Sequence, residues 1–223
     1  KTKILSKELL AGQVLPSEKD YCALYSVSRM TIRQALGELQ SEGLIYSVKG
    51  KGTLVSRPKV EQYLSKLTSF SVDMRKRGFV PGSIVLETAV VKATLELAEY
   101  LQVGAGTELF YLARLRTADG TPMAIERGYF NQRITGDLLT ANFDNKSLYE
   151  YLVEKRNVQL SRASQSLETI SASKRDAEIL QINESVPCML MKRQTFTASN
   201  QVVEYTESVY IGSRYKFYVE MTV

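Results

Sequence analysis

Residues 15–56, "LPSEKDYCALYSVSRMTIRQALGELQSEGLIYSVKGKGTLVS", carry the densest series of helix and turn signals in the chain. The Pro-Ser-Glu sequence at 16–18 is typical of a helix start, because proline and acidic side chains suit the first helical turn. It predicts a helix over 17–25. The buried face of this helix is expected to consist of Tyr21, Cys22 and Leu24.

A second helix is predicted to begin after the turn at 26–27, with Ser28 as its N-cap and Gly43 at its end. Apolar residues at helical spacing give it one core-facing side. These residues are Ile32, Ala35, Leu36 and Leu39. The strands "LIYSV" and "GTLVS" then flank the glycine-rich turn "KGKG", which predicts a hairpin. A helix–turn–helix followed by such a hairpin is a winged helix-turn-helix.

The apolar side leaves Arg29 and Arg33, four residues apart, on an exposed face at the start of the second helix. Backbone N–H groups and the helix dipole attract phosphate there. A DNA major groove also accepts such a helix, with arginine pairing with guanine and glutamine with adenine. Cations on the glycine-flanked turn suit the minor groove or the backbone. This reasoning predicts DNA contacts from Ser28, Arg29, Thr31, Arg33, Gln34, Lys49 and Lys51. The alternative is an ordinary amphipathic helix with a solvated polar face.

The charge of the chain is unevenly placed. Residues 1–60 contain ten Lys/Arg and five Asp/Glu, whereas residues 61–223 contain nineteen of each. The formal charge of +5 therefore belongs to the N-terminal quarter, which favours a polyanionic partner.

Other functional classes are disfavoured by composition. The chain has no histidine and two cysteines without CxxC spacing, so we expect no metal site, no cofactor and no catalytic triad. Two lone cysteines suit a reducing cytoplasm. No apolar run reaches the length of about 20 residues that a membrane span needs. The first residues already read as helix, so the natural N-terminus is expected upstream.

The composition changes beyond Pro58, and we predict a winged helix-turn-helix domain over 1–58, a linker over 59–66 and a second domain over 67–223. Strands dominate the second domain, which indicates an α+β fold with an antiparallel sheet. Asp119-Gly120 is a strong turn signal between two of them. Other strands are expected at 160–172, 188–197, 201–211 and 216–223, and helices near 94–102, 147–156 and 173–181.

A weak repeat runs through the second domain. "AEYLQV" at 98 recurs as "AEILQI" at 177, each followed by a hairpin, and Arg114 and Arg193 then stand in equivalent strands. Glu126 and Glu204 follow in the returning strands, one residue out of register. Either the domain contains a duplication, or two helix–hairpin units simply look alike.

The quoted segment resembles the winged-helix module of GntR-type bacterial regulators, whose pattern is LPSE, VSR-x-T-[VI]-R-x-A-L, EGL and a G-[RK]-G-T-[FL]-V wing. From "LTSFSVDMRKRGFVPGS" to "YTESVYIGSRYKFYVEMTV", the chain resembles the UTRA effector domain of the HutC subfamily, and most of all the repressors of N-acetylglucosamine utilisation. Lys7 departs from the glycine that the family often has there. The resemblance adds Lys19 and Gly50 to the predicted DNA contacts.

Several residues of the second domain have side chains suited to a ligand. Arg114 and Arg116 alternate along one strand and so share a face of the sheet, and Ser147 is placed to cap a helix that could hold a phosphate. Glu126 and Glu204 suit sugar hydroxyls or an amine. The predicted effector-binding set is Ser69, Phe70, Ser71, Arg114, Arg116, Glu126, Ser147, Tyr149, Arg162, Glu204 and Tyr210. The alternative is that each is an ordinary surface or capping residue.

The resemblance implies roles for most of this set. The loop at 69–71, Arg114 and Ser147 would hold the phosphate of a phosphosugar. Glu126, Glu204 and Tyr210 would meet the sugar. A phosphorylated amino sugar, glucosamine-6-phosphate or its N-acetyl form, is therefore the expected effector of a cytoplasmic, homodimeric repressor that binds double-stranded operator DNA.

Three alternatives stay open: another sugar phosphate or an organic acid as effector, activation instead of repression, and an enzyme of the lyase type, since the second domain resembles the chorismate-lyase fold. The loop at 69–71 follows the linker closely, so we expect a ligand that moves this loop to reorient the DNA-binding heads.

Overall fold

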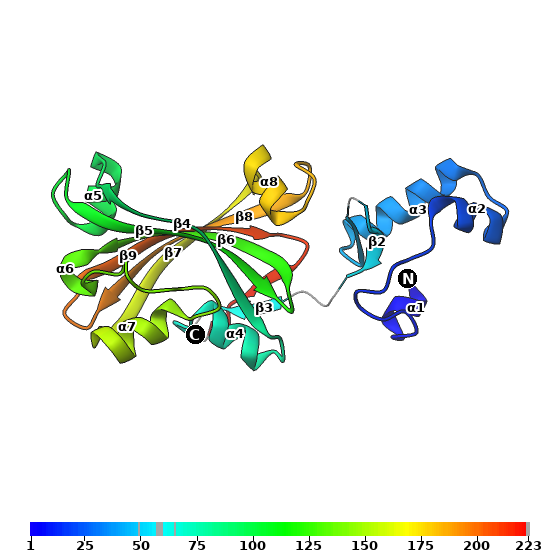
Figure 1. Ribbon diagram of the computed structural model, residues 1–223. Coiled ribbons are helices and arrows are strands. Elements are labelled where there is room, and N and C mark those ends of the chain that lie inside the picture. The colour runs from blue at the N-terminus through cyan, green and yellow to red at the C-terminus, as the bar shows by residue number, and fades with distance from the viewer. Residues whose placement is uncertain (49, 57–59, 65, 222–223) are drawn as a thin grey trace. The chain divides into compact units, whose positions relative to one another are not determined.

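The computed structural model describes residues 1–48, 50–56, 60–64 and 66–221 (Figure 1). The chain forms two compact units, the second of which begins at Val60. The predicted linker over 59–66 therefore contains the first strand of the second unit, β3 (Val60–Tyr63). Lys49, a predicted DNA contact on the wing, lies outside the described residues.

The first unit has the predicted order of helices and strands. Ser17 caps α2 by accepting a hydrogen bond from the N–H of Asp20, whose side chain in turn accepts from the N–H of Ser17. Ser28 caps α3 by accepting from the N–H of Thr31 at 3.2 Å, as predicted. Strands β1 and β2 pair antiparallel. The elements are α1 (Thr2–Leu5), α2 (Glu18–Tyr25), α3 (Arg29–Ser41), β1 (Ile45–Val48) and β2 (Gly52–Val55).

The core of the first unit is small. Leu15, Ile45 and Val55 are buried together, and Ile32 is the buried residue of α3. Two sequence predictions are wrong here: Ala35 is exposed, and Leu24 is 68% exposed. Leu24 lies in the last turn of α2, which ends at Ser26 in a left-handed conformation.

The second unit is built on a six-stranded antiparallel sheet in the order β4-β5-β6-β9-β8-β7, which confirms the α+β prediction. The predicted turn at Asp119-Gly120 joins β5 and β6, and both residues have positive φ. The strands are β4 (Pro81–Lys92), β5 (Glu108–Ala118), β6 (Thr121–Asn131), β7 (Leu160–Ser171), β8 (Pro187–Thr197) and β9 (Val202–Ile211).

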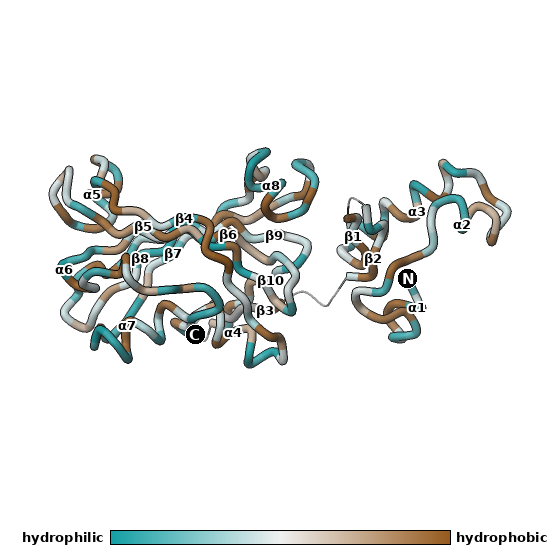
Figure 2. The backbone as a smooth tube through the Cα atoms, viewed as in Figure 1, coloured by the Kyte–Doolittle hydropathy of each residue, from teal (hydrophilic) through white to brown (hydrophobic). Residues whose placement is uncertain are grey.

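Helices cover both faces of this sheet (Figure 1). Helices α4 (Phe70–Lys76) and α7 (Leu148–Arg156) lie on one face, whereas α5 (Leu95–Leu101) and α8 (Lys174–Leu180) lie on the other. The short α6 (Gln132–Thr135) follows β6. In Figure 2, α7 carries both teal and brown segments, and its buried residues are Leu148 and Leu152. The predicted loop at 69–71 is instead the start of α4, with Ser69 as its N-cap.

The repeat seen in the sequence is present in the structure. Each half of the unit runs helix, strand, helix and hairpin: α4-β4-α5-β5-β6, then α7-β7-α8-β8-β9. The central pair β6–β9 joins the halves, so that β4 and β7 take the two edges of the sheet. Ser69 and Ser147 cap the first helix of each half. Equivalent residues of the two halves therefore meet near the middle of the sheet.

A second, two-stranded sheet starts and ends this unit. Strand β3 pairs in parallel with β10 (Tyr215–Tyr218), with Val60 opposite Tyr215. Both residues are buried, and they share a core cluster with Met74 of α4 and Tyr210 of β9. The strand predicted over 216–223 is thus shorter than expected, and it leaves the main sheet.

Candidate DNA-reading helix and effector pocket

The start of α3 presents the predicted polar residues. Arg29, Thr31, Arg33 and Gln34 are exposed, and Ser28 keeps its hydroxyl within 2.9 Å of Thr31 Oγ1. Lys19 is exposed on the preceding helix. The structure therefore gathers these residues on two consecutive helices. Gly50 and Lys51 form the described part of the wing turn, where Gly50 adopts φ +80°, a conformation that glycine accepts at no steric cost.

One residue that the sequence reasoning missed joins the two arginines. Glu18 of α2 accepts a hydrogen bond from Arg29 Nε at 2.7 Å and from Arg33 Nε at 3.1 Å. These bonds lower the pKa of Glu18. Its place in the "LPSE" segment was visible, but nothing in the sequence brings α2 against the first turn of α3.

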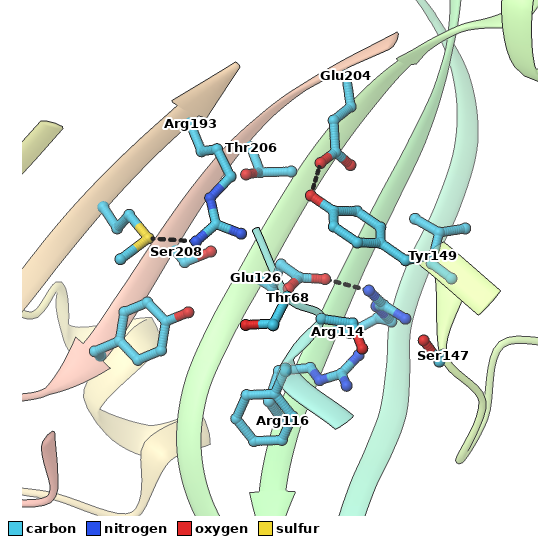
Figure 3. Close-up of a pocket in the computed structure, with 15 residues that line it drawn as sticks. Thr68, Arg114, Arg116, Glu126, Ser147, Tyr149, Arg193, Glu204, Thr206 and Ser208 are labelled. Carbon is cyan, nitrogen blue, oxygen red and sulfur yellow. Dashed lines mark hydrogen bonds and ion pairs between the residues drawn. The ribbon is translucent and has the colours of Figure 1, made fainter. Parts of the chain in front are cut away.

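The second unit holds a pocket on the sheet face that α4 and α7 cover (Figure 3). Nine of the eleven predicted effector-binding residues line it: Ser69, Phe70, Arg114, Arg116, Glu126, Ser147, Tyr149, Glu204 and Tyr210. The first half of the repeat contributes two arginines, a glutamate and the N-cap of a helix, and the second half contributes one arginine, a glutamate and the N-cap of a helix. The free cavity measures about 30 Å³, room for roughly two water molecules.

Arg114 and Glu126 occupy the centre of the pocket. They lie directly opposite each other on β5 and β6, and the Arg114 guanidinium forms an ion pair with the Glu126 carboxylate. Burial alone would raise the pKa of Glu126, but the charges of Arg114 and Arg116 outweigh it and lower the pKa to about 2. Glu126 is therefore ionised at neutral pH.

Arg116 lies two residues further along β5 on the same face. Its Nη2 donates to Ser71 Oγ at 3.1 Å, and its guanidinium lies 4.5 Å from the centre of the Phe70 ring. Burial and the neighbouring Arg114 lower the pKa of Arg116 to about 10, which still leaves it charged at neutral pH. The start of α4 thus holds this arginine in place.

Tyr149 and Glu204 form the opposite wall. The Tyr149 hydroxyl donates to Glu204 Oε1, and Thr195 Oγ1 donates to the same oxygen at 2.8 Å. Burial raises the pKa of Glu204, and it raises the pKa of Tyr210 to about 12. The neutral Tyr210 hydroxyl can donate a hydrogen bond to a ligand oxygen.

The predicted set missed six residues that line the pocket: Thr68, Leu148, Met191, Arg193, Thr206 and Ser208. Arg193 is the charged one among them. Its Nε donates to Gln165 Oε1 at 3.0 Å and its Nη2 lies 3.4 Å from Met191 Sδ. Among the described residues, no carboxylate lies within ion-pair distance of it. Figure 3 shows Arg193 beside Thr206 and Ser208, across the pocket from Arg114 and Ser147. The repeat was the signal, because it made Arg193 the counterpart of Arg114.

Two predicted residues do not line the cavity. Ser71 lies behind it, buried on α4 and bonded to Arg116. Arg162 is exposed on the edge strand β7, where its guanidinium contacts Asn200 and stacks 3.7 Å from the centre of the Phe196 ring. A register shift between Leu160 and Arg162 accompanies this placement, which alternation along the strand could not foresee.

Comparison with known proteins agrees with both units. Residues 1–55 match the family described as bacterial regulatory proteins, gntR family, and residues 76–216 match the UTRA domain. The chain belongs to the GntR family. It is 41% identical over 217 residues to the HTH-type transcriptional repressor NagR of Bacillus subtilis, covering 97% of this chain and 89% of that protein.

More distant relatives share the same architecture. The histidine utilization repressor of Pseudomonas putida is 30% identical, over 91% of this chain and 80% of that protein. The crystal structure of PhnF from Mycobacterium smegmatis matches with a TM-score of 0.72 and 25% identity, covering 100% of this chain and 97% of that one. The chain is thus a DNA-binding transcriptional repressor of the GntR/HutC type with a UTRA domain.

In the described residues, no helix has the length and apolarity that crossing a membrane requires. Nor do the described cysteine, aspartate and glutamate side chains gather in any group of three that could hold a metal ion.

Proposed function

We propose that this repressor binds a palindromic operator as a homodimer and that a phosphorylated amino sugar controls its affinity for DNA. The observation that carries the effector class is the charge of the pocket, where the buried Arg114 and Arg116 and the half-buried Arg193 outnumber the two glutamates that line it. The division of the chain into a DNA-binding domain and an effector domain belongs to the same proposal, with the effector domain starting at Val60 and not at residue 67 as the sequence predicted.

The DNA-binding part rests on α3. Its exposed arginines, Thr31 and Gln34 lie at the N-terminal end of the helix, the part that reaches base edges when such a helix enters a major groove. Lys19 of α2 and the Gly50–Lys51 wing flank this end in the sequence pattern and supply backbone contacts. One helix reads one half-site, so a two-fold dimer supplies the second.

The effector class follows from charge balance. Three arginines, Arg114, Arg116 and Arg193, face two glutamates in the pocket, and burial raises the pKa of one of them, Glu204. The pocket therefore carries excess positive charge. A phosphate monoester has a charge of about −1.5 to −2 at pH 7 and balances this excess, whereas a neutral sugar does not.

The cavity volume adds a condition. Because about 30 Å³ is too small for a sugar phosphate, binding requires side chains to move apart. The bonds that close the pocket are the Arg114–Glu126 ion pair and the Tyr149–Glu204 hydrogen bond. A ligand whose oxygens replace these bonds opens the pocket and moves the N-terminal ends of α4 and α7. The ligand then makes contacts in the open conformation that it cannot make in the closed one, and effector control requires such a difference.

The test is thermal unfolding of the full chain with glucosamine-6-phosphate, its N-acetyl form, the unphosphorylated sugars, organic acids and fatty acids. We expect the phosphosugars to raise Tm, as mass action requires for a ligand of the folded state. The Arg114→Ala variant should lose this shift. Arg162→Ala removes an arginine outside the cavity and should keep it.

Stabilisation by organic acids alone would contradict the amino-sugar proposal and leave the DNA-binding part intact. Recovery of the phosphosugar after prolonged incubation addresses the lyase alternative, because a regulator returns its effector unchanged.

A further inference from the structure

Glu18 connects the two helices of the DNA-binding motif at one point. Arg29 and Arg33 are four residues apart on α3 and so lie on one face. Arg29 Nε donates to Glu18 Oε2 at 2.7 Å, and Arg33 Nε lies 3.1 Å from both Oε1 and Oε2. A single carboxylate at the start of α2 therefore holds both guanidinium groups.

Both contacts use the Nε edge of the guanidinium. An arginine carries five N–H groups in a rigid planar fork, so the two Nη atoms of each side chain remain available. Among the described residues, these Nη atoms donate no hydrogen bond. Two Nη groups side by side match O6 and N7 of guanine. Glu18 thus occupies the edge that does not need to reach a base.

Stability does not account for this arrangement. The side chains of Arg29 and Arg33 are 70% and 56% exposed, and ion pairs at such exposure contribute little to folding. A carboxylate beside a DNA-binding surface also repels phosphates, which weakens binding to every sequence alike. The Glu18 carboxylate instead orients the arginines. A guanidinium already fixed by a hydrogen bond loses less rotamer freedom when it binds a base.

We propose that Glu18 is a positioning residue that determines sequence specificity. It holds the Nε edges of Arg29 and Arg33 so that their Nη edges read base edges, and it opposes the transfer of either guanidinium to a phosphate. This inference rests on the proposed placement of α3 in the major groove.

The test compares two duplexes of equal length: one selected by the wild-type chain from a random library, and one of random sequence. The measure of specificity is the Kd for the random duplex divided by the Kd for the selected duplex. In Glu18→Gln we expect this ratio to fall by about 5–150-fold, the contribution of one bidentate arginine–guanine contact. Binding to the random duplex should tighten, and its salt dependence should steepen by about 0.9 for each guanidinium that moves to a phosphate.

Glu8→Gln is the matched control. It removes the same charge from the same unit and an exposed ion pair of 2.9 Å with Lys3, so it should shift both Kd values together and leave their ratio unchanged. Glu18→Asp keeps the charge and the favourable acid in the first turn of α2, but its carboxylate is one methylene short of both arginines. We expect it to lower the ratio without changing the net charge.

Two results overturn the proposal. One is a Kd ratio in Glu18→Gln equal to the ratio in Glu8→Gln, which would mean that Glu18 affects DNA binding only through net charge. The other is a wild-type ratio in Glu18→Asp. Arg29→Ala and Arg33→Ala separate these from a failure of the proposed function: an unchanged ratio in both variants would show that neither arginine reads a base.

Discussion

The buried charges of the pocket differ in what balances them. Arg114 faces Glu126 directly across two strands, so its charge is paired within the protein. Arg193, its counterpart in the repeat, faces Thr206 in the register of β8 and β9. An arginine opposite a threonine leaves its counter-charge to a ligand. Under the proposed function, the ion pair of the first half stabilises the pocket, and Arg193 of the second half attracts the anionic effector.

Replacing Glu126 with Gln tests this division of roles. The change leaves the buried Arg114 without its counter-ion, and we expect the free energy of unfolding at pH 7 to fall by about 3 kcal/mol, the low end for breaking a buried pair. Because the folded-state pKa of Glu126 is lowered to about 2, its stabilisation is complete above the unfolded pKa of about 4.5 and is lost as pH falls to about 2.

Urea denaturation from pH 7 to pH 3 measures the effect, and the gap between wild type and variant should narrow below pH 4.5. Added glucosamine-6-phosphate should restore part of the loss at pH 7. A variant as stable as the wild type would show that Arg114 finds another partner.

At the scale of elements, the sequence predicted well those features that depend on neighbouring residues alone, such as helix caps. Ser28 and Ser147 cap helices as expected, because a hydroxyl before an apolar helical stretch suffices to identify a cap. Helix α4 was missed, since its seven residues lack a full apolar period and its cap, Ser69, sits in a segment that the resemblance presented as a loop. Strand β4, at one edge of the sheet, was also not predicted.

Long-range contacts had no local signal. The position of Arg162 depends on a register shift at the sheet edge, and the contact of Glu18 with α3 depends on the angle between two helices. The pocket residues were predicted because the family resemblance and the internal repeat indicated which distant residues lie together, which spacing along the sequence cannot do. Arg193 shows the limit: the repeat pointed to it, but only the register of β8 and β9 places it at the cavity.

The caps of α4 and α5 provide a matched test at this scale. Ser69 Oγ accepts from the N–H of Val72 at 3.2 Å, and Thr94 Oγ1 accepts from the N–H of Leu97 at 3.2 Å on the opposite face of the sheet. Ser69→Ala and Thr94→Ala should each lower the free energy of unfolding by about 1 kcal/mol. Only Ser69 lines the pocket, so calorimetric titration with glucosamine-6-phosphate should show weaker binding in Ser69→Ala alone. Equal affinities in the two variants would remove the start of α4 from the effector site.

At the scale of the whole molecule, the first strand of the second unit connects the pocket to the chain that arrives from the first. Val60 shares one hydrophobic cluster with Phe70 and Tyr210, both of which line the pocket. Tyr210 packs edge-on against Tyr215 and Phe217 of β10, with ring centres 4.5 and 5.4 Å apart. Because β10 pairs with β3, a ligand that displaces Phe70 or Tyr210 acts on the strand from which the chain leads back to the first unit.

This connection predicts that effector control depends on a short chain between Ser56 and Val60. Eight added Gly/Ser residues at this point form a flexible coil, so a displacement of β3 no longer constrains the first unit. We expect the effector to raise Tm as in the wild type, and operator binding without effector to persist at reduced affinity, whereas the effector no longer changes the operator Kd. The same insertion at Ser199, in the turn between β8 and β9, is the control and should leave effector control intact. Titration of a selected duplex with and without glucosamine-6-phosphate distinguishes the two variants. Undiminished control in the Ser56 variant would show that the signal does not pass through β3, and that the ligand acts on the DNA-binding units through another part of the dimer.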